Sequence, residues 1–176
     1  MTIPHQRASM RKIFRTFLWM TLLSAVLFSS THRVQASGTL ISAPSRVDMV
    51  YDSARDLLYI TDGGSVLRYH LGSNTFMTPF AIGGNLGGID ISPDGNTLVI
   101  ADRRRLDPIV WVYVINLQTE QIQQVLFPSA FYEGGTYTVA YANDSTVLVT
   151  STFEGSGWVP LRKLNPITGA WSEIKR

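Results

Sequence analysis

The sequence contains no cysteine and only three histidines among its 176 residues. The absence of cysteine excludes a disulfide framework, thiol catalysis, cysteine-ligated zinc and covalent haem attachment. Two histidines, His5 and His32, precede residue 37, so the rest of the chain holds only His70. A cluster of histidine metal ligands within one chain is therefore excluded, and a Ser-His-Asp triad would have to use His70, which we expect to be structural. We expect neither a cofactor nor a metal site.

Acidic residues are absent from the first 36 positions, which hold five of the 15 Lys and Arg residues. The rest of the chain has 10 basic and 13 acidic residues, a net charge of −3, although the whole chain has a net charge of +2. This mildly acidic remainder does not favour a nucleic acid or an anionic membrane surface as partner. With 45% hydrophobic and 16% charged residues, the composition is that of a globular protein.

The apolar run near the N-terminus is too short to cross a bilayer. It spans residues 17–28, only 12 positions, whereas a spanning helix needs about 20. Arg11 and Lys12 precede the run, and Val34 and Ala36 supply the small residues that a signal peptidase recognises. The pattern predicts a signal peptide over residues 1–36, cleaved after Ala36. We therefore expect a secreted or periplasmic protein that has no membrane segment after cleavage. The alternative is an uncleaved membrane anchor.

Residues 37–176 are predicted to form a single repeat domain. Residues 47–62 match residues 87–102 without a gap at an offset of 40, and residues 136–151 fit at a further offset of 49. Each copy has a short strand, a polar turn and an apolar strand, which is typical of a β-hairpin. A second pair of strands follows each hairpin, so each unit has four strands. We expect these units at about 46–82, 87–127 and 136–176.

The second strand of each unit is apolar at consecutive positions, namely 58–60, 98–100 and 147–149. A sheet with one wet face would alternate polar and apolar residues, so these strands are expected to be covered on both faces. Stacked blades provide such cover, which predicts an all-β, β-propeller-like array of three four-stranded antiparallel blades. Propellers have about four to eight blades, so we expect an incomplete ring that is closed by homo-oligomerisation or by additional blades. A β-sandwich is the alternative.

Residues 89–102 (IDISPDGNTLVIAD) and 112–122 (VYVINLQTEQI) resemble the YVTN-type repeat of β-propellers, a relative of the WD-repeat and NHL-repeat families. In that repeat a Ser-Pro-Asp-Gly turn precedes a strand that ends near Asp, and an apolar-Ile-Asp-x-x-Thr segment forms the third and fourth strands. This chain departs from it at the acidic position of that segment, which is occupied by His70, Asn116 and Asn165. The resemblance implies a propeller fold. Its members include binding platforms, lactonases and cofactor-dependent dehydrogenases, so function depends on the site.

The candidate site lies in the loops at one end of the array. These are the connections between the second and third strands of a unit and those between units. They vary in length, whereas the opposite turns are short in every unit. Variable loops on a rigid scaffold commonly carry binding sites. We expect the ligand-binding face to comprise Arg103, Arg104, Arg105, Asp107, Phe131, Tyr132, Glu133, Glu154 and Trp158.

Two functions of different class are compatible with these residues. The first is a non-catalytic module that binds a protein, a glycan or an acidic ligand, because arginines suit bidentate bonds to anions and aromatic rings suit stacking. The second is a lactonase or sugar-acid hydrolase, or an inactive fragment of a larger propeller protein. Catalysis would require carboxylate, amide or histidine groups that converge on the axis. The loops offer mainly arginine, glutamate and aromatic residues, which favours the binding module.

Overall fold

The computed structural model describes residues 38–155 and 158–174, so the predicted signal peptide lies outside the described residues. The chain divides into two units, 1–41 and 42–176, and the fold below is that of the second. Among the described residues, no helix is long and apolar enough to span a membrane. The elements are twelve strands: β1 (Arg46–Asp52), β2 (Leu57–Asp62), β3 (Ser65–His70), β4 (Thr75–Ala81), β5 (Leu86–Ile91), β6 (Thr97–Asp102), β7 (Ile109–Asn116), β8 (Ile122–Pro128), β9 (Glu133–Tyr141), β10 (Val147–Phe153), β11 (Leu161–Leu164) and β12 (Trp171–Ile174).

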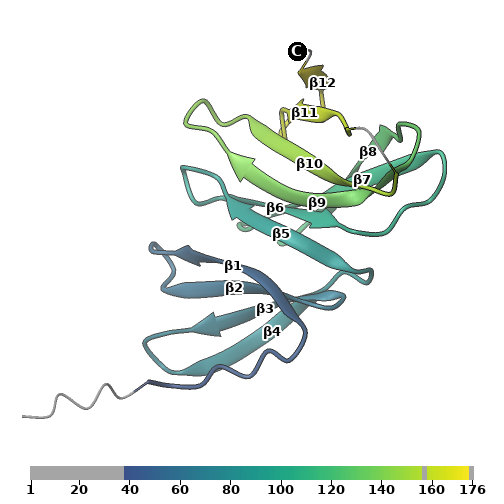
Figure 1. Ribbon diagram of the computed structural model, residues 1–176. Helices are drawn as coiled ribbons and strands as arrows, with labels where there is room; N and C mark the ends of the chain where they lie inside the picture. Colours follow the sequence, from purple (N-terminus) through teal and green to yellow (C-terminus); the bar gives the residue numbers. More distant parts are fainter. Residues whose placement is uncertain (1–37, 156–157, 175–176) are drawn as a thin grey trace, which may run out of the picture. The chain divides into compact units, whose positions relative to one another are not determined.

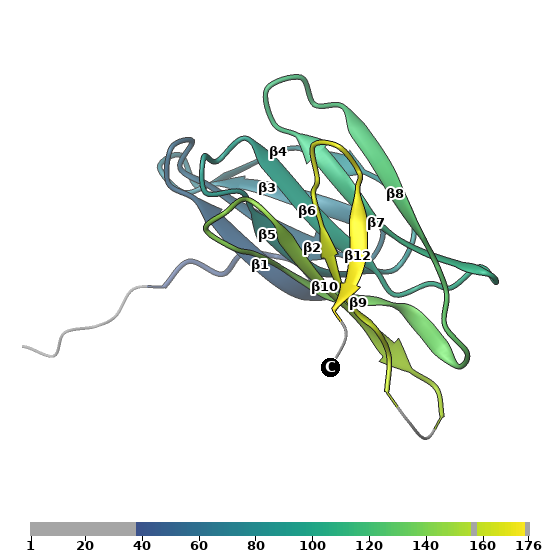
Figure 2. The same ribbon diagram turned by 90° about the horizontal axis from the view of Figure 1, so that it is seen from above.

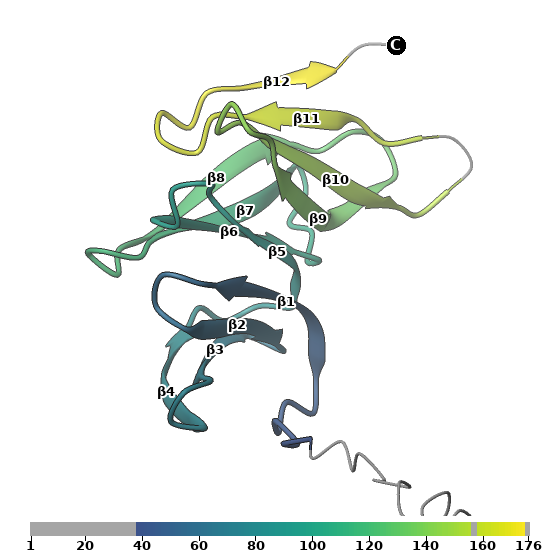
Figure 3. The same ribbon diagram turned by 90° about the vertical axis from the view of Figure 1, so that its left-hand side faces the viewer.

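The strands form three four-stranded sheets, in the orders β1-β2-β3-β4, β5-β6-β7-β8 and β9-β10-β11-β12 (Figure 1). Every pairing between neighbouring strands is antiparallel. The sheets are termed blade 1, blade 2 and blade 3, and they stack in chain order (Figure 3). The first strand of blade 2, β5, contacts the first strands of both other blades, β1 and β9 (Figure 2). The predicted array of three antiparallel blades is thus confirmed, and it does not close into a ring.

The hairpin that opens each blade turns through a residue in the left-handed backbone region. In blade 2 this residue is Gly95, with φ of +71°. The turn is braced by Ser92, whose hydroxyl oxygen accepts hydrogen bonds from the amides of Asn96 and Thr97, at 3.1 and 2.9 Å. Glycine adopts this conformation without steric cost, which is why the Asp-Gly pair is a reliable turn signal.

Two apolar cores lie between the blades, and blade 2 contributes to both. The face of a blade toward the preceding blade is termed its upstream face, and the opposite one its downstream face. Leu98, Ile100, Tyr113 and Ile115 of blade 2 join the core shared with blade 1. Val99, Ala101, Val112 and Val114 join the core shared with blade 3. The expectation of cover on both faces is therefore met in the middle blade. Each large side chain buried in this way contributes about 1.5–3 kcal/mol.

The three residues at the position that is acidic in the YVTN-type pattern, His70, Asn116 and Asn165, share one structural role. The Nδ1 atom of His70 accepts a hydrogen bond from the amide of Ser73 at 3.0 Å. The Oδ1 atoms of Asn116 and Asn165 accept equivalent bonds from the amides three residues later, at 3.0 and 3.1 Å. All three side chains therefore present an acceptor that closes the turn between the third and fourth strands. This agrees with the structural role expected for His70.

Candidate functional site

The variable loops meet at one end of the array and are joined by backbone hydrogen bonds. The loop face is defined as residues 63–64, 82–85, 103–108, 129–132, 154–155 and 158–160. The Arg103 amide donates to the carbonyl of Asn85 at 2.8 Å, and the Glu154 amide donates to that of Tyr132 at 2.9 Å. Gly135 allows the start of β9 to approach this end, because a Cβ atom there would collide with the backbone of Arg103. The loops are therefore held in place before any ligand arrives.

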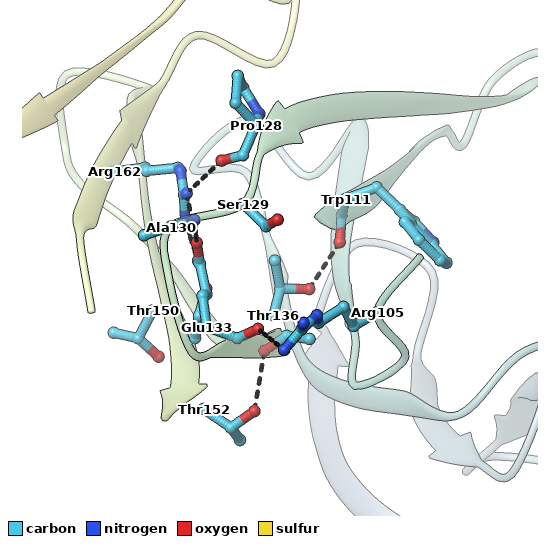
Figure 4. A network of polar contacts seen from close by, with 12 residues as sticks. Arg105, Trp111, Pro128, Ser129, Ala130, Glu133, Thr136, Thr150, Thr152 and Arg162 are labelled. Carbon is cyan, nitrogen blue, oxygen red and sulfur yellow. Dashed lines mark hydrogen bonds and ion pairs between the residues drawn. The ribbon is translucent and has the colours of Figure 1, made fainter. Parts of the chain in front are cut away.

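Glu133 belongs to the predicted binding residues, but the structure places its side chain inside the protein. Its carboxylate receives both terminal nitrogens of Arg162, with the Nη2–Oε2 distance at 2.8 Å, and both side chains are fully buried (Figure 4). The amide of Ala130 also donates to Glu133, at 2.7 Å. Burial raises the pKa of the Glu133 carboxyl, but the bonds from Arg162 and Ala130 outweigh burial and hold this pKa below its ordinary value. The carboxylate therefore organises the loop and is not presented to a ligand.

Arg105 lies where three loops converge. Its Nε atom donates to Asp107 Oδ1 at 2.6 Å, and its Nη2 atom donates to Asp107 Oδ2. Its Nη1 atom donates to the carbonyl oxygen of Glu133 at 3.0 Å (Figure 4). The same nitrogen lies 3.2 Å from Glu154 Oε2. The guanidinium charge is thus balanced by two exposed carboxylates, Asp107 and Glu154. Arg105 braces the loops of blades 2 and 3 against each other.

Arg104 and Arg103 are also engaged within the chain. The Nη2 atom of Arg104 lies 2.8 Å from Oδ2 of Asp102, a fully buried carboxylate, and its guanidinium lies 5.4 Å from the ring centre of Trp111. The Nη2 atom of Arg103 donates to the Leu86 carbonyl at 3.4 Å. Each of the three arginines therefore has a partner inside the protein, which lowers their capacity to hold an acidic ligand.

Asp102 is a buried residue at this end of the molecule and is not among the predicted binding residues. It accepts hydrogen bonds from the Trp111 indole at 3.2 Å and from the Asn85 amide at 3.3 Å, besides those from Arg104. Burial raises the pKa of the Asp102 carboxyl, but the hydrogen bonds and the charge of Arg104 hold it below its ordinary value. Asp102 thereby fixes the start of the loop that carries the three arginines.

The exposed part of the loop face is aromatic. Phe131 is 82% exposed and Tyr132 is 51% exposed, and their ring centres are 4.0 Å apart. Tyr132 has φ of +57°, a conformation that is rare for a bulky residue, and its ring meets Phe153 edge-on at 6.5 Å. Leu106 and Trp158 are also exposed at this end of the molecule. We term the three aromatic residues Phe131, Tyr132 and Trp158, together with the exposed Leu106, the aromatic patch.

A depression of about 370 Å³ adjoins this patch. It is lined by Arg105, Asp107, Ser129, Ala130, Phe131 and Tyr132. One wall is the ion pair of Arg105 and Asp107, and the other is formed by the rings of Phe131 and Tyr132. The depression therefore suits an apolar group with a polar edge. Among the described residues, no group of three His, Asp or Glu side chains is arranged to hold a metal ion. Of the predicted residues, Arg105, Asp107, Phe131 and Tyr132 line this depression, Glu154 is bound to Arg105, and Glu133 is buried.

Comparison with known proteins bears on the fold alone. No protein-family model matches the sequence, and no curated protein matches it. The β-propeller domain of Cps50 (Swd1) from Myceliophteria thermophila superimposes with a TM-score of 0.57 at 14% identity, over 78% of this chain and 40% of that domain. The Kuenenia stuttgartiensis hydrazine synthase gives 0.46 at 13% identity, over 80% and 52% of the two chains. A protein of unknown function from Desulfotomaculum acetoxidans gives 0.45 at 16% identity, over 79% and 58%. The chain therefore has the blade architecture of a β-propeller and spans less than half of the Cps50 domain.

Proposed function

We propose that this partial β-propeller, built from YVTN-type repeats, is an exported interaction module that binds a partner protein through the aromatic patch. The observation that carries the proposal is the pair Phe131 and Tyr132, which stand exposed beside a depression on a braced loop end. Grouped exposed aromatic residues often mark interaction sites, and tyrosine and arginine are enriched among residues that dominate binding energy.

The charges around the depression argue for recognition by packing. Arg105 is paired with Asp107 and Glu154, so an anion would have to displace a carboxylate that is already bound. Exposed ion pairs of this kind contribute little to affinity by themselves. They supply a polar rim around an apolar centre, which is the usual organisation of a protein interface. An acidic ligand is therefore a weaker candidate than a partner with an apolar side chain.

The two buried carboxylates at the loop end, Asp102 and Glu133, favour binding over catalysis. Asp102 and Glu133 are buried in ion pairs with Arg104 and Arg162, and both carboxyl pKa values are depressed. A general base or acid needs a pKa near the working pH and access to substrate. Neither carboxylate has these properties, so the lactonase alternative receives no support from them.

The experiment uses a photo-crosslinking amino acid in place of Leu106, with the protein produced in its source organism. We expect a discrete protein adduct that is lost in Phe131→Ala and in Tyr132→Gly. Tyr137→Ala is the matched control, because Tyr137 is 51% exposed, like Tyr132, but lies on β9 outside the patch. An adduct that persists in both patch variants would reject the proposal. Glycan binding by the wild type that the same variants abolish, without a protein adduct, would replace protein by carbohydrate as the ligand.

Export is tested separately by N-terminal sequencing of the protein recovered outside the cytoplasm. A mature chain that begins at Ser37 is expected from the cleavage pattern before it. A species that keeps residues 1–36 and fractionates with membranes would identify the segment as an anchor instead.

A further inference from the structure

Strand register identifies equivalent positions in the three blades. Ile60, Ile100 and Val149 of the second strands pair with Met49, Ile89 and Val139 of the first strands, respectively. Ile89 and Val139 lie in the cores between blades, with 4% and 5% exposure, whereas Met49 is 63% exposed. Met49 therefore occupies a core position of the repeat, but no blade among the described residues covers it.

Other residues of the upstream face of blade 1 follow the same pattern. Tyr51 pairs with Leu58, as Ile91 pairs with Leu98 in blade 2. Tyr51 is 48% exposed, whereas Ile91 is half-buried against blade 1. On the fourth strand of the same face Phe76 is 45% exposed, whereas Tyr69, to which it pairs, is buried. The exposed strip therefore consists of Met49, Tyr51 and Phe76. The strip has the chemistry of a packed blade face, and in blades 2 and 3 the equivalent face covers the downstream face of the preceding blade.

The downstream face of blade 3 keeps the polar features of the packed downstream face of blade 1. In blade 1 the Thr61 hydroxyl accepts from the Asp48 amide at 3.1 Å, and Thr150 repeats this bond with the Thr138 amide at 3.3 Å. Thr61 Oγ1 also lies 2.9 Å from the Gly87 carbonyl oxygen of blade 2. Thr150 occupies the same position in blade 3 and is half-buried.

A basic residue recurs on the same face. Lys163 pairs with Leu148 across the sheet, as Arg68 pairs with Tyr59 in blade 1. Arg68 forms an ion pair with Glu120 of the following blade at 2.9 Å. Ala140, beside Leu148 on this face, is exposed. Blade 3 thus presents a downstream face of the kind that blade 1 uses against blade 2.

We propose that two copies of this chain associate, with the upstream face of blade 1 in each copy packed on the downstream face of blade 3 in the other. The two contacts are related by a two-fold axis and close six blades into one ring, within the usual range of about four to eight. In blade 1 the Thr61 hydroxyl contacts the Gly87 carbonyl oxygen of the following blade. In the proposed arrangement the Thr150 hydroxyl makes the equivalent contact with the Val47 carbonyl oxygen of the second copy. The proposal concerns the blade faces and is independent of the loop-face partner.

The test uses sedimentation or light scattering of the full chain across a dilution series. The wild type is expected to have the mass of two chains and to dissociate on dilution. Met49→Lys and Ala140→Arg each place a charge on one of the two faces and are expected to raise the dissociation constant at least about tenfold. Ile167→Lys is the control, because Ile167 is 82% exposed in the turn between β11 and β12. At high dilution, where all proteins are monomers, thermal melts of the variants that match that of the wild type show that the variants fold.

Mixing the two variants distinguishes this arrangement from any other dimer. Each homodimer has two damaged contacts, but a mixed pair has one damaged and one intact contact. The mixture is therefore expected to associate more tightly than either variant alone. A wild-type chain that remains a monomer at all concentrations overturns the proposal. A mixture that associates no more tightly than either variant alone also overturns it. Such a result would mean that the same face of both copies forms the contact.

Discussion

Arg162 donates from both terminal nitrogens to the carboxylate of Glu133, and neither side chain is exposed to solvent. In the strand register, Arg162 pairs with Val149 where the apolar Tyr113 pairs with Ile100 in blade 2. Its guanidinium lies 5.3 Å from the ring centre of Phe127 and 5.9 Å from that of Trp171. The charged Arg162 thus occupies a position that is apolar in the other two blades. The carboxylate of Glu133 compensates its buried charge.

Glu133→Gln is expected to lower the free energy of unfolding by about 3 kcal/mol, because it leaves the Arg162 charge buried without compensation. The measurement is urea denaturation at neutral pH. Glu154→Gln is the control, since Glu154 forms an exposed ion pair, and it is expected to change stability by less than about 1 kcal/mol. Equal losses in the two variants would show that burial does not set the value of the pair.

Stability is expected to fall in acid because of Asp102 and Glu133. Both carboxyl pKa values are depressed in the folded protein, and the unfolded values are about 3.9 and 4.3. The folded state therefore binds fewer protons, so this stabilisation is present above the unfolded pKa values and is lost as pH falls through the folded ones. Urea midpoints measured from pH 7 to pH 3 test the trend. Glu133→Gln is expected to reduce its slope, and an identical slope in that variant would exclude Glu133 as a source.

His70→Asn is expected to leave stability nearly unchanged, because asparagine presents an acceptor to the Ser73 amide as Asn116 does to that of Thr119. His70→Ala removes the acceptor and is expected to cost about 1 kcal/mol. Thermal or urea unfolding of both variants compares them directly. If alanine and asparagine behave alike, the side chain does not support the turn.

Thr136→Val is expected to destabilise the protein by about 1–3 kcal/mol, the cost of unsatisfied buried polar groups. The Thr136 hydroxyl is fully buried, accepts from the Asp102 amide at 2.8 Å and lies 2.6 Å from the Trp111 carbonyl oxygen of blade 2 (Figure 4). Valine keeps the shape and removes all three contacts of this hydroxyl, including that with the Asp102 carbonyl oxygen at 3.1 Å. Thr138→Val is the exposed control on the same strand, and a loss of similar size there would point to strand propensity instead.

The blade architecture could be predicted because it follows from the local pattern of apolar and turn residues along the chain. Consecutive apolar residues at 98–100 and the turn at Gly95 each have one simple structural solution. The exception is the third hairpin, where gapless alignment sets Ala140 against Ile91. In the structure Tyr141 pairs with Val147 as Ile91 pairs with Leu98, because this turn is one residue shorter. A slip of one residue reverses which face a side chain joins, and only the paired strand reveals it.

The site was harder to predict because pairing partners lie far apart in sequence. Loop variability predicted that Arg105, Tyr132 and Glu154 lie at one end, and in the structure Arg105 contacts Glu154 and lines a depression with Tyr132. Loop variability gave no sign that Glu133 points inward, since its partner Arg162 is 29 positions away on β11. One signal was present in the repeat itself: Arg162 occupies a position that is apolar in both other units, Leu67 and Tyr113. A charged residue at a core position of a repeat implies a buried counter-charge.

The backbone bonds that join neighbouring loops bear on how selective the proposed binding at this end would be. Segments that are already ordered lose little conformational entropy on association, so contact energy is converted into affinity with small losses. The same rigidity prevents the loops from reshaping around an ill-fitting molecule. For the proposed partner this means a narrow choice of molecule, set by the contour of Phe131 and Tyr132, without the promiscuity that adaptable surfaces allow.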